Sequence, residues 1–163
     1  MGYTAATWVG FGEALAAVAG AMTGLLFVAL SVKGEALTAS RRLSSRAAQT
    51  LVLFMTSVLI AVLLVAPQPR IALGAELLAL AAFSGGTLIV LDRRAGHAGD
   101  REVSHYIERF SPNTITAVLV GVAGLTLLLR AGGGLYWLIP AAVASLVGGV
   151  VNAWLFLVRV TAG

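Results

Sequence analysis

The sequence predicts an all-α fold, a polytopic membrane helical bundle with five transmembrane helices and a short amphipathic cytoplasmic helix. Three observations support this prediction. The 163 residues are 59% hydrophobic and only 11% charged, whereas soluble domains average about 25% charged residues. The apolar residues form five runs that approach or exceed the ~20 residues needed to cross a bilayer. The eleven Lys and Arg residues lie outside these runs or at their ends, so we expect one transmembrane domain over residues 1–163.

The first expected span covers about residues 11–32 and follows a short tail with Tyr3 and Trp8, aromatic residues that prefer the membrane interface. A polar link then leads to the second span, about residues 46–66. Pro67 stops this span, because proline cannot continue a helix. The third span covers about residues 71–91.

Residues 92–111 form the longest polar stretch and are expected to be a cytoplasmic loop. Within the loop, apolar residues follow the i, i+3, i+4, i+7 pattern of an amphipathic helix that lies on the membrane or packs under the bundle; they are Val103, Tyr106, Ile107 and Phe110. Pro112 suits the first position of a fourth helix, expected over about residues 113–130. A glycine-rich reversal at 131–134 then precedes the fifth span, about residues 135–160.

The distribution of basic residues predicts the orientation of these spans. Arg70 and Arg130 fall on one side, and the other nine fall on the opposite side, namely Lys33, Arg41, Arg42, Arg46, Arg93, Arg94, Arg101, Arg109 and Arg159. The positive-inside rule places the N-terminus outside and the C-terminus in the cytoplasm. Trp8, Tyr136 and Trp137 then lie at the outer interface. Since the distribution of basic residues is explained by membrane orientation, the net charge of +4 does not indicate nucleic-acid binding.

Helical spacing gives the first span two different faces. One face carries small residues and one acid, namely Glu13, Ala17, Gly20, Gly24 and Ser31, because residues three and four apart are neighbours on a helix. Gly20 and Gly24 have the small-xxx-small spacing that lets two membrane helices approach closely. The opposite face, which includes Leu15 and Leu26, is expected to contact lipid.

The fifth span repeats the small-residue pattern at four-residue intervals, with Ala141, Ser145, Gly149 and Ala153. We expect Gly20, Gly24, Ser145 and Gly149 to pack helices of several copies together in a homo-oligomer. Asn152 lies beside this stripe and is expected to bond across to another helix, with a role as a ligand for substrate as the alternative. In the second span, the hydroxyls of Thr56 and Ser57 can bond back to their own helix.

Glu76, in the third span, is the most informative single residue. It lies six residues beyond Arg70, roughly 9 Å along the helix, so Glu76 and Glu13 are expected at similar depths. Acids in membrane helices usually face the bundle interior and mark ion or proton pathways. The alternatives are that Glu76 pairs with Arg70 or Arg130, or that it lies shallow enough to reach interfacial water. The candidate ion-pathway residues are therefore Glu13, Glu76 and Asn152.

These patterns predict a homo-oligomeric channel or transport component that passes cations or protons. The alternative is a non-conducting accessory or regulatory subunit that packs against another membrane protein. No nucleophile–base motif is present and the chain has no cysteine, so we do not expect an enzyme or a cofactor. Four polar loop residues match no standard metal-site spacing, so no metal is expected; they are His97, Asp100, Glu102 and His105.

Three phrases resemble a group of small multi-pass membrane proteins common in actinobacteria. They are GLLFVALSV (Gly24–Val32), RAAQTLVLF (46–54) and GGVVNAWLFLV (Gly148–Val158). Members of this group are described as uncharacterised or, loosely, as modulators of a membrane protease. The resemblance implies a bacterial cytoplasmic (inner) membrane protein and supplies no catalytic residues.

Overall fold

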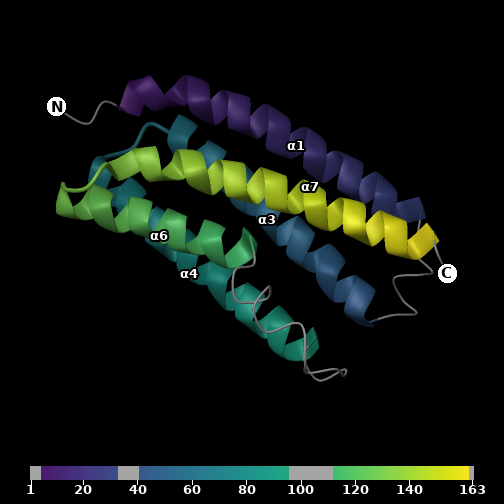
Figure 1. Cartoon of the computed structure of the whole chain (residues 1–163). Coiled ribbons are helices and arrows are strands. Elements are labelled where there is room, and N and C mark those ends of the chain that lie inside the picture. The colour runs from purple at the N-terminus through teal and green to yellow at the C-terminus, as the bar shows by residue number, and fades with distance from the viewer. Residues whose placement is uncertain (1–4, 33–40, 96–111, 162–163) are drawn as a thin grey trace.

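The structure, a computed structural model, describes residues 5–32, 41–95 and 112–161, and these ranges contain helices and no strand (Figure 1). Its long helices are α1 (Val9–Val32), α3 (Arg41–Val65), α4 (Arg70–Ala95), α6 (Pro112–Leu129) and α7 (Leu138–Thr161). Two short 3-10 helices, η1 (Ala5–Trp8) and η3 (Gly134–Trp137), precede α1 and α7. The all-helical prediction is confirmed for these residues. The predicted amphipathic helix and the loop histidines lie outside them.

Four segments are long and apolar enough to cross a membrane: Val9–Val32, Ala47–Val65, Pro112–Leu129 and Gly134–Trp154. They coincide with four of the five expected spans. The remaining expected span falls on α4, which is a continuous helix. The ends of all five long helices lie within five residues of the predicted limits.

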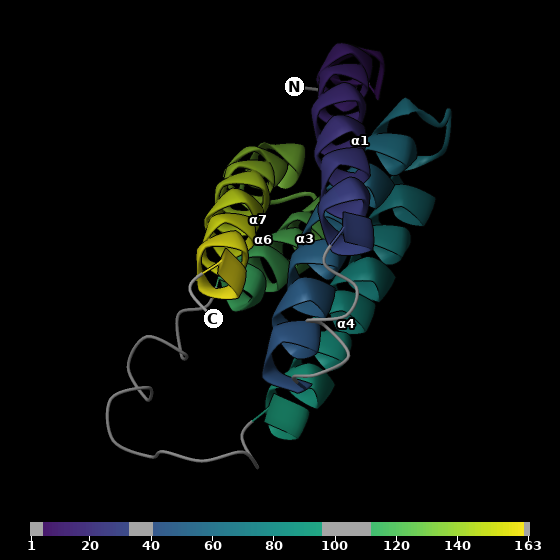
Figure 2. The same ribbon diagram turned by 90° about the vertical axis from the view of Figure 1, so that its right-hand side faces the viewer.

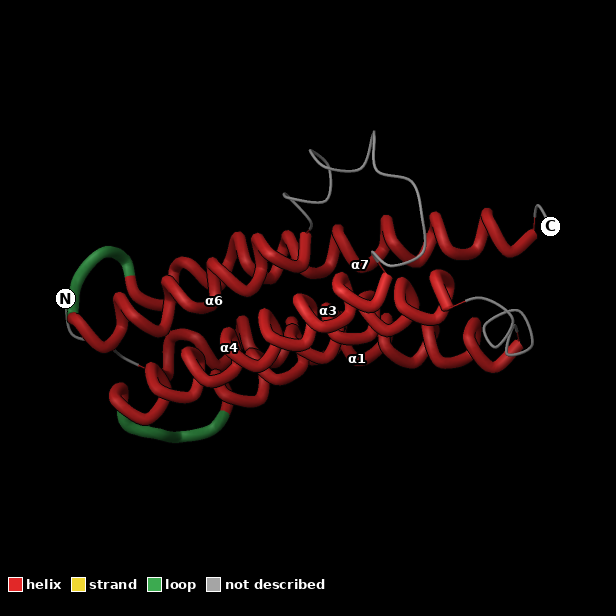
Figure 3. Tube along the Cα trace, turned by 90° about the horizontal axis from the view of Figure 1, so that it is seen from below, coloured by secondary structure: helices red, strands yellow, loops and turns green. Residues whose placement is uncertain are grey.

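Helix α3 is the centre of the arrangement, because it packs against α1, α4 and α7 (Figures 1 and 2). Helix α6 completes the bundle by packing against α4 and α7. Viewed from below, α6 and α7 lie along one side and α4, α3 and α1 along the other (Figure 3). The core between them is apolar, with Ile60, Leu77 and Val120 fully buried. By contrast, α1 and α7 share few contacts.

Two glycines outside the predicted small-residue stripes bring α4 and α6 together. A Cβ atom added to Gly124 would lie 2.8 Å from the carbonyl oxygen of Gly74. A Cβ atom added to Gly74 would lie 2.8 Å from Leu128. Because real Cβ atoms do not approach so closely, these positions require glycine, as at other small-residue contacts between membrane helices.

The small-residue stripe of α7 packs against α3 within the same chain. A Cβ atom on Gly149 would overlap the ring of Phe54, lying 2.8 Å from Cζ. Ser145 is fully buried in the same contact. Ser145 and Gly149 therefore lie in a close helix contact within one chain. The expectation that these residues join separate copies needs correction, because Phe54 already fills the space beside Gly149.

The reversal between α6 and α7 depends on left-handed backbone conformations. Arg130 has φ 57°, and the three following glycines, residues 132–134, have φ between 54° and 97°. The N–H of Ala131 donates to the carbonyl of Thr126 at 3.1 Å, the long-range bond of a Schellman motif that closes a helix C-terminus. The predicted glycine turn is confirmed, with arginine where glycine is usual.

Aromatic residues gather at this end of the bundle. The ring of Trp8 meets the rings of Phe11 and Tyr136 edge to face, at centroid distances of 5.8 and 5.1 Å. Trp137 Nε1 donates to the carbonyl of Gly132 at 2.6 Å. The residues expected as anchors at one interface therefore share one end of the bundle.

Candidate functional site

The two acids of the candidate ion pathway lie near the same end of the bundle but do not meet within one chain. Glu13 is four residues from the start of α1 and Glu76 six residues from the start of α4, about 6 and 9 Å along helices that begin at the same end (Figure 1). Both side chains are exposed. Each helix packs on α3, and α1 and α4 share no extensive contact.

Neither acid forms an ion pair within the described residues, so the alternative in which Arg70 neutralises Glu76 is not observed. Arg70 instead donates through Nη1 to the carbonyls of Leu127 and Leu128, at the end of α6. A cation is favourable there, because the last carbonyls of a helix lack partners and carry partial negative charge. Arg130 is exposed.

The surface around Glu13 differs from the sequence expectation. Leu15 and Leu26 are buried, whereas Gly20 and Gly24 are exposed with no atom within 4 Å of an added Cβ. The expectation that this face of α1 contacts lipid is therefore wrong for Leu15 and Leu26, which pack inside the chain, whereas Val18, Leu25 and Val28 of the same face are exposed. We call the outward surface of Glu13, Ala17, Gly20 and Gly24 the α1 face.

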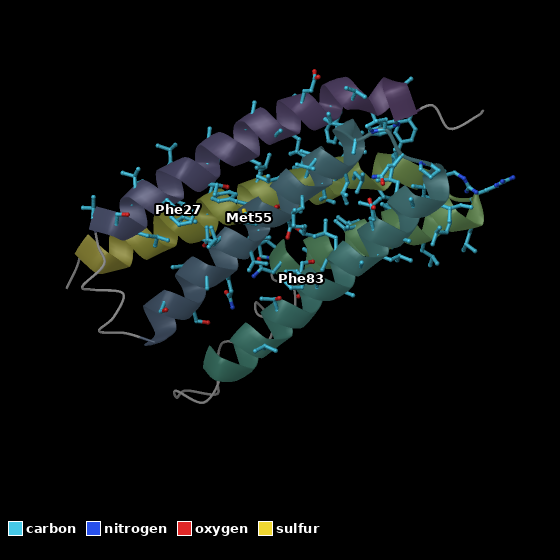
Figure 4. The ribbon with its side chains drawn as sticks, turned by 180° about the vertical axis from the view of Figure 1, so that it is seen from behind. Phe27, Met55 and Phe83 are labelled. Atoms are coloured by element: carbon cyan, nitrogen blue, oxygen red, sulfur yellow. The ribbon has the colours of Figure 1, made fainter. Side chains whose placement is uncertain are left out.

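A second outward surface surrounds Glu76. Ala79, Phe83 and Gly86 follow Glu76 at intervals of three and four residues and are all exposed. We call these four residues the α4 face. Figure 4 labels Phe83 on this helix, together with the exposed Phe27 of α1 and Met55 of α3. Each of the two faces therefore carries one carboxylate among apolar residues.

Hydroxyl groups inside the bundle bond to one another and to the backbone. Ser57 Oγ donates to Ser145 Oγ at 2.8 Å, and Ser145 Oγ donates to the carbonyl of Leu53 at 2.7 Å. Thr56 Oγ1 donates to the carbonyl of Val52 at 2.7 Å, as expected. Ser57 does not bond back to its own helix, because Ser145 of α7 lies within reach. These bonds connect α3 to α7 through buried hydroxyls.

The two asparagines are placed differently in the structure. Asn152 is half-buried, and the expected bond to another helix is not found within the described residues. Asn113, which the sequence analysis did not select, is 3% exposed. Its Oδ1 atom is buried without a hydrogen-bond partner. Only its position in the first turn of α6 distinguishes it in the sequence, and that gives no indication of its burial.

An apolar groove separates α1 from α7. One part, of about 210 Å³, is lined by Ala29 of α1, Trp154 of α7 and Phe54 of α3, among others. A neighbouring part, of about 240 Å³, extends the groove to Val18 and Leu146. Met22 and Val150 line both parts. Among the described residues, no three His, Cys, Asp or Glu side chains come together as metal ligands.

Comparison with protein-family models, curated proteins and solved structures gives no match for this chain. The resemblance to small actinobacterial membrane proteins stays a prediction from the sequence.

Proposed function

We propose that the protein is an oligomeric membrane protein with five spans, in which α4 also crosses the bilayer. Between Arg70 and Asp92, the only charged residue of α4 is Glu76. Helix α4 also packs alongside α6, which is long and apolar enough to cross a membrane. The described helix ends are asymmetric in charge. One end carries six arginines and one aspartate, and the other carries two arginines and two glutamates. The positive-inside rule then supports an N-terminus outside and a C-terminus in the cytoplasm, in a bacterial inner membrane.

The proposed activity is passage of cations or protons between subunits, beside Glu13 and Glu76. The observation that carries it is that both acids are exposed on the surface of a single chain and unpaired among the described residues. A carboxylate facing lipid costs on the order of a few kcal/mol. Contacts between subunits through the α1 and α4 faces would remove both acids from lipid.

Assembly of several subunits would also determine which ions the proposed path admits. Glu13 and Glu76 start from similar depths, so repetition around an axis would form an acidic ring at the outer end. Rings of carboxylates favour cations over anions. The small residues of the α1 face allow the close helix approach that an assembly of this kind requires.

The test is ion flux into liposomes that contain the purified protein alone. Glu76→Gln retains the shape of the side chain and removes its charge, so it should reduce flux without changing assembly, and Glu13→Gln should have a smaller effect. Asp92→Asn removes one negative charge at the opposite end of α4 and is the matched control. Unchanged flux in Glu76→Gln, or equal loss in Asp92→Asn, would contradict the role of Glu76.

A second candidate is a non-conducting subunit of a larger membrane assembly. It is favoured by the closed packing between α3 and α7, where buried hydroxyls bond to each other and leave no polar path. The α1 and α4 faces would then dock on helices of another membrane protein. Absence of flux under any gradient, from wild-type protein that is correctly assembled, would favour this candidate over a channel.

A further inference from the structure

Three helices form one outward layer of the bundle. Helices α1 and α4 each pack on α3 and share no extensive contact with each other, so they flank α3. Figure 4 shows α1, α3 and α4 side by side in front of α6 and α7, with Phe27, Met55 and Phe83 on the three helices. These side chains are 54%, 44% and 70% exposed. The α1 face and the α4 face therefore belong to the two outer helices of one exposed layer.

The two faces match in the heights of their residues. Helices α1 and α4 begin at the same end of the bundle and run in the same direction (Figure 1), so heights can be counted from the first residue of each helix. Glu13 and Ala17 lie at about 6 and 12 Å, and Glu76 and Ala79 at about 9 and 13.5 Å. Residues of the two faces thus alternate in height, as they do in helices that pack with knobs in holes.

The two faces also match in the sizes of their side chains. Phe83 lies at about 19.5 Å, midway between Gly20 at about 16.5 Å and Gly24 at about 22.5 Å. No atom lies within 4 Å of a Cβ added to either glycine, so the α1 face has room for a ring at this height. In the reverse sense, Phe27 of α1 lies at about 27 Å, close to Gly86 of α4 at about 24 Å. Gly86 also has no atom within 4 Å of an added Cβ.

A two-fold axis would bring the α1 face and the α4 face together twice. Because α1 and α4 flank α3, a second copy rotated by 180° about the membrane normal, with its layer facing the first, places its α4 opposite α1 and its α1 opposite α4. The rotation keeps the direction of each helix across the membrane, so the heights given above apply between the copies. Such an interface is self-complementary, because every contact between two residues occurs twice.

We propose that the layer of α1, α3 and α4 is a two-fold interface with a second copy of this chain, in which Phe83 of each copy lies between Gly20 and Gly24 of the other. A second copy is a better occupant than lipid, because it also removes Glu13 and Glu76 from hydrocarbon, where a carboxylate is costly. The inference rests on the proposed function in one respect. Glu13 comes beside Glu76 of the second copy, and a proton or cation carried between the subunits offsets their repulsion.

The test is disulfide formation between single-cysteine chains, which has no background because the chain contains no cysteine. Chains with Ala17→Cys and chains with Ala79→Cys carry different affinity tags and are produced in the same cells, so a mixed disulfide must join two copies. We expect this product, because the two positions differ by only about 1.5 Å in height. A disulfide requires Cα atoms within about 7 Å. Ala21→Cys, on exposed α1 surface outside the α1 face, is the control and should not join to Ala79→Cys.

The outcomes distinguish this interface from the proposed function. Disulfides in Ala17→Cys chains produced alone would show that α1 packs against α1. That result, or an assembled particle without the mixed product, would overturn the two-fold layer and leave an oligomer whose ion flux can still be measured. A wild-type protein that is monomeric in the membrane would overturn both the interface and the proposed path between subunits.

An exchange of side-chain sizes tests the position of Phe83. Gly20→Leu should reduce the fraction of assembled particles severalfold, because leucine takes the space that Phe83 of the second copy needs. Addition of Phe83→Ala to Gly20→Leu should restore most of the assembly. Ile71→Ala, which removes an exposed side chain of α4 outside the α4 face, is the matched control and should not restore it. No recovery with Phe83→Ala, or equal recovery with Ile71→Ala, would contradict the contact between Phe83 and the two glycines.

Discussion

Replacing Gly149 by Ala should destabilise the chain, although alanine is the better helix former. The new Cβ would overlap the ring of Phe54, lying 2.8 Å from Cζ and 3.0 Å from Cδ1. Phe54 is only 2% exposed, so its ring cannot move aside without disturbing the contact between α3 and α7. Overpacking of this kind typically costs 1–3 kcal/mol. The helix-propensity gain of about 1 kcal/mol seen in water should contribute little, because helices persist in membrane proteins before they associate.

Gly10→Ala is the matched control, because Gly10 lies outside the α1 face and no atom lies within 4 Å of the Cβ it would add. We expect it to change the free energy of unfolding by less than about 0.5 kcal/mol. A double-mutant cycle with Phe54→Leu should recover about 1 kcal/mol of the loss in Gly149→Ala, since the two residues are in contact. The assay is reversible unfolding by SDS in mixed micelles, followed by tryptophan fluorescence. A neutral Gly149→Ala, or equal losses in both glycine variants, would refute the close contact between α3 and α7.

Four further predictions follow from other contacts. Arg70→Met should lower the free energy of unfolding by about 1–2 kcal/mol in the same assay, because the last carbonyls of α6 lose their donor; no loss would contradict this capping role. Arg130→Gly should stabilise the chain by about 1 kcal/mol, since φ 57° suits glycine better than arginine, and a destabilised variant would argue against the left-handed turn. Ser145→Ala should lower the free energy of unfolding by only about 0.6–1 kcal/mol, because the Ser57 hydroxyl, which donates to Ser145, can donate to a carbonyl of its own helix instead. A loss above ~3 kcal/mol would be inconsistent with this rearrangement. In intact cells, Ala131→Cys should react with an impermeant thiol reagent and Gly99→Cys should not, and the reverse pattern would invert the proposed orientation.

The sequence was sufficient to predict where the helices begin and end. Proline stops α3, and three glycines with positive φ make the reversal before α7. These are local effects, because each depends on the conformations that one residue allows. The length and apolarity of the four segments able to cross a membrane were also predictable, because both are properties of the sequence itself.

The sequence was not sufficient to predict which face of each helix is buried. Lipid and protein interiors are equally apolar, so hydropathy does not distinguish Leu15, which is buried, from Leu25, which is 65% exposed. The spacing of Gly20 and Gly24 indicates a capacity for close packing, but contact requires a partner helix at the same level. Gly74 and Gly124 have such partners in one another and stood out less in the sequence.

For polar residues, too, the sequence does not predict which neighbour each side chain meets. Thr56 and Ser57 are neighbours with similar side chains, yet only Ser57 bonds across to α7, because it points toward Ser145. The exposure of Glu13 and Glu76 likewise depends on the packing of α1 and α4 against α3. From sequence alone, acids in membrane helices are expected to face an interior. Here that interior would have to be formed between subunits.

The most direct test of this account is the mass of the detergent-solubilised particle, measured by light scattering for three forms of the protein. We predict that the wild-type particle contains several subunits and that Gly20→Leu reduces its mass, because leucine blocks close approach on the α1 face. Ala21→Leu, on exposed α1 surface outside that face, should leave the mass unchanged. A Cβ added at Gly20 meets no atom of the same chain within 4 Å, and Ala21 is exposed. A monomeric wild-type particle, or a mass unaffected by Gly20→Leu, would contradict assembly through the α1 face.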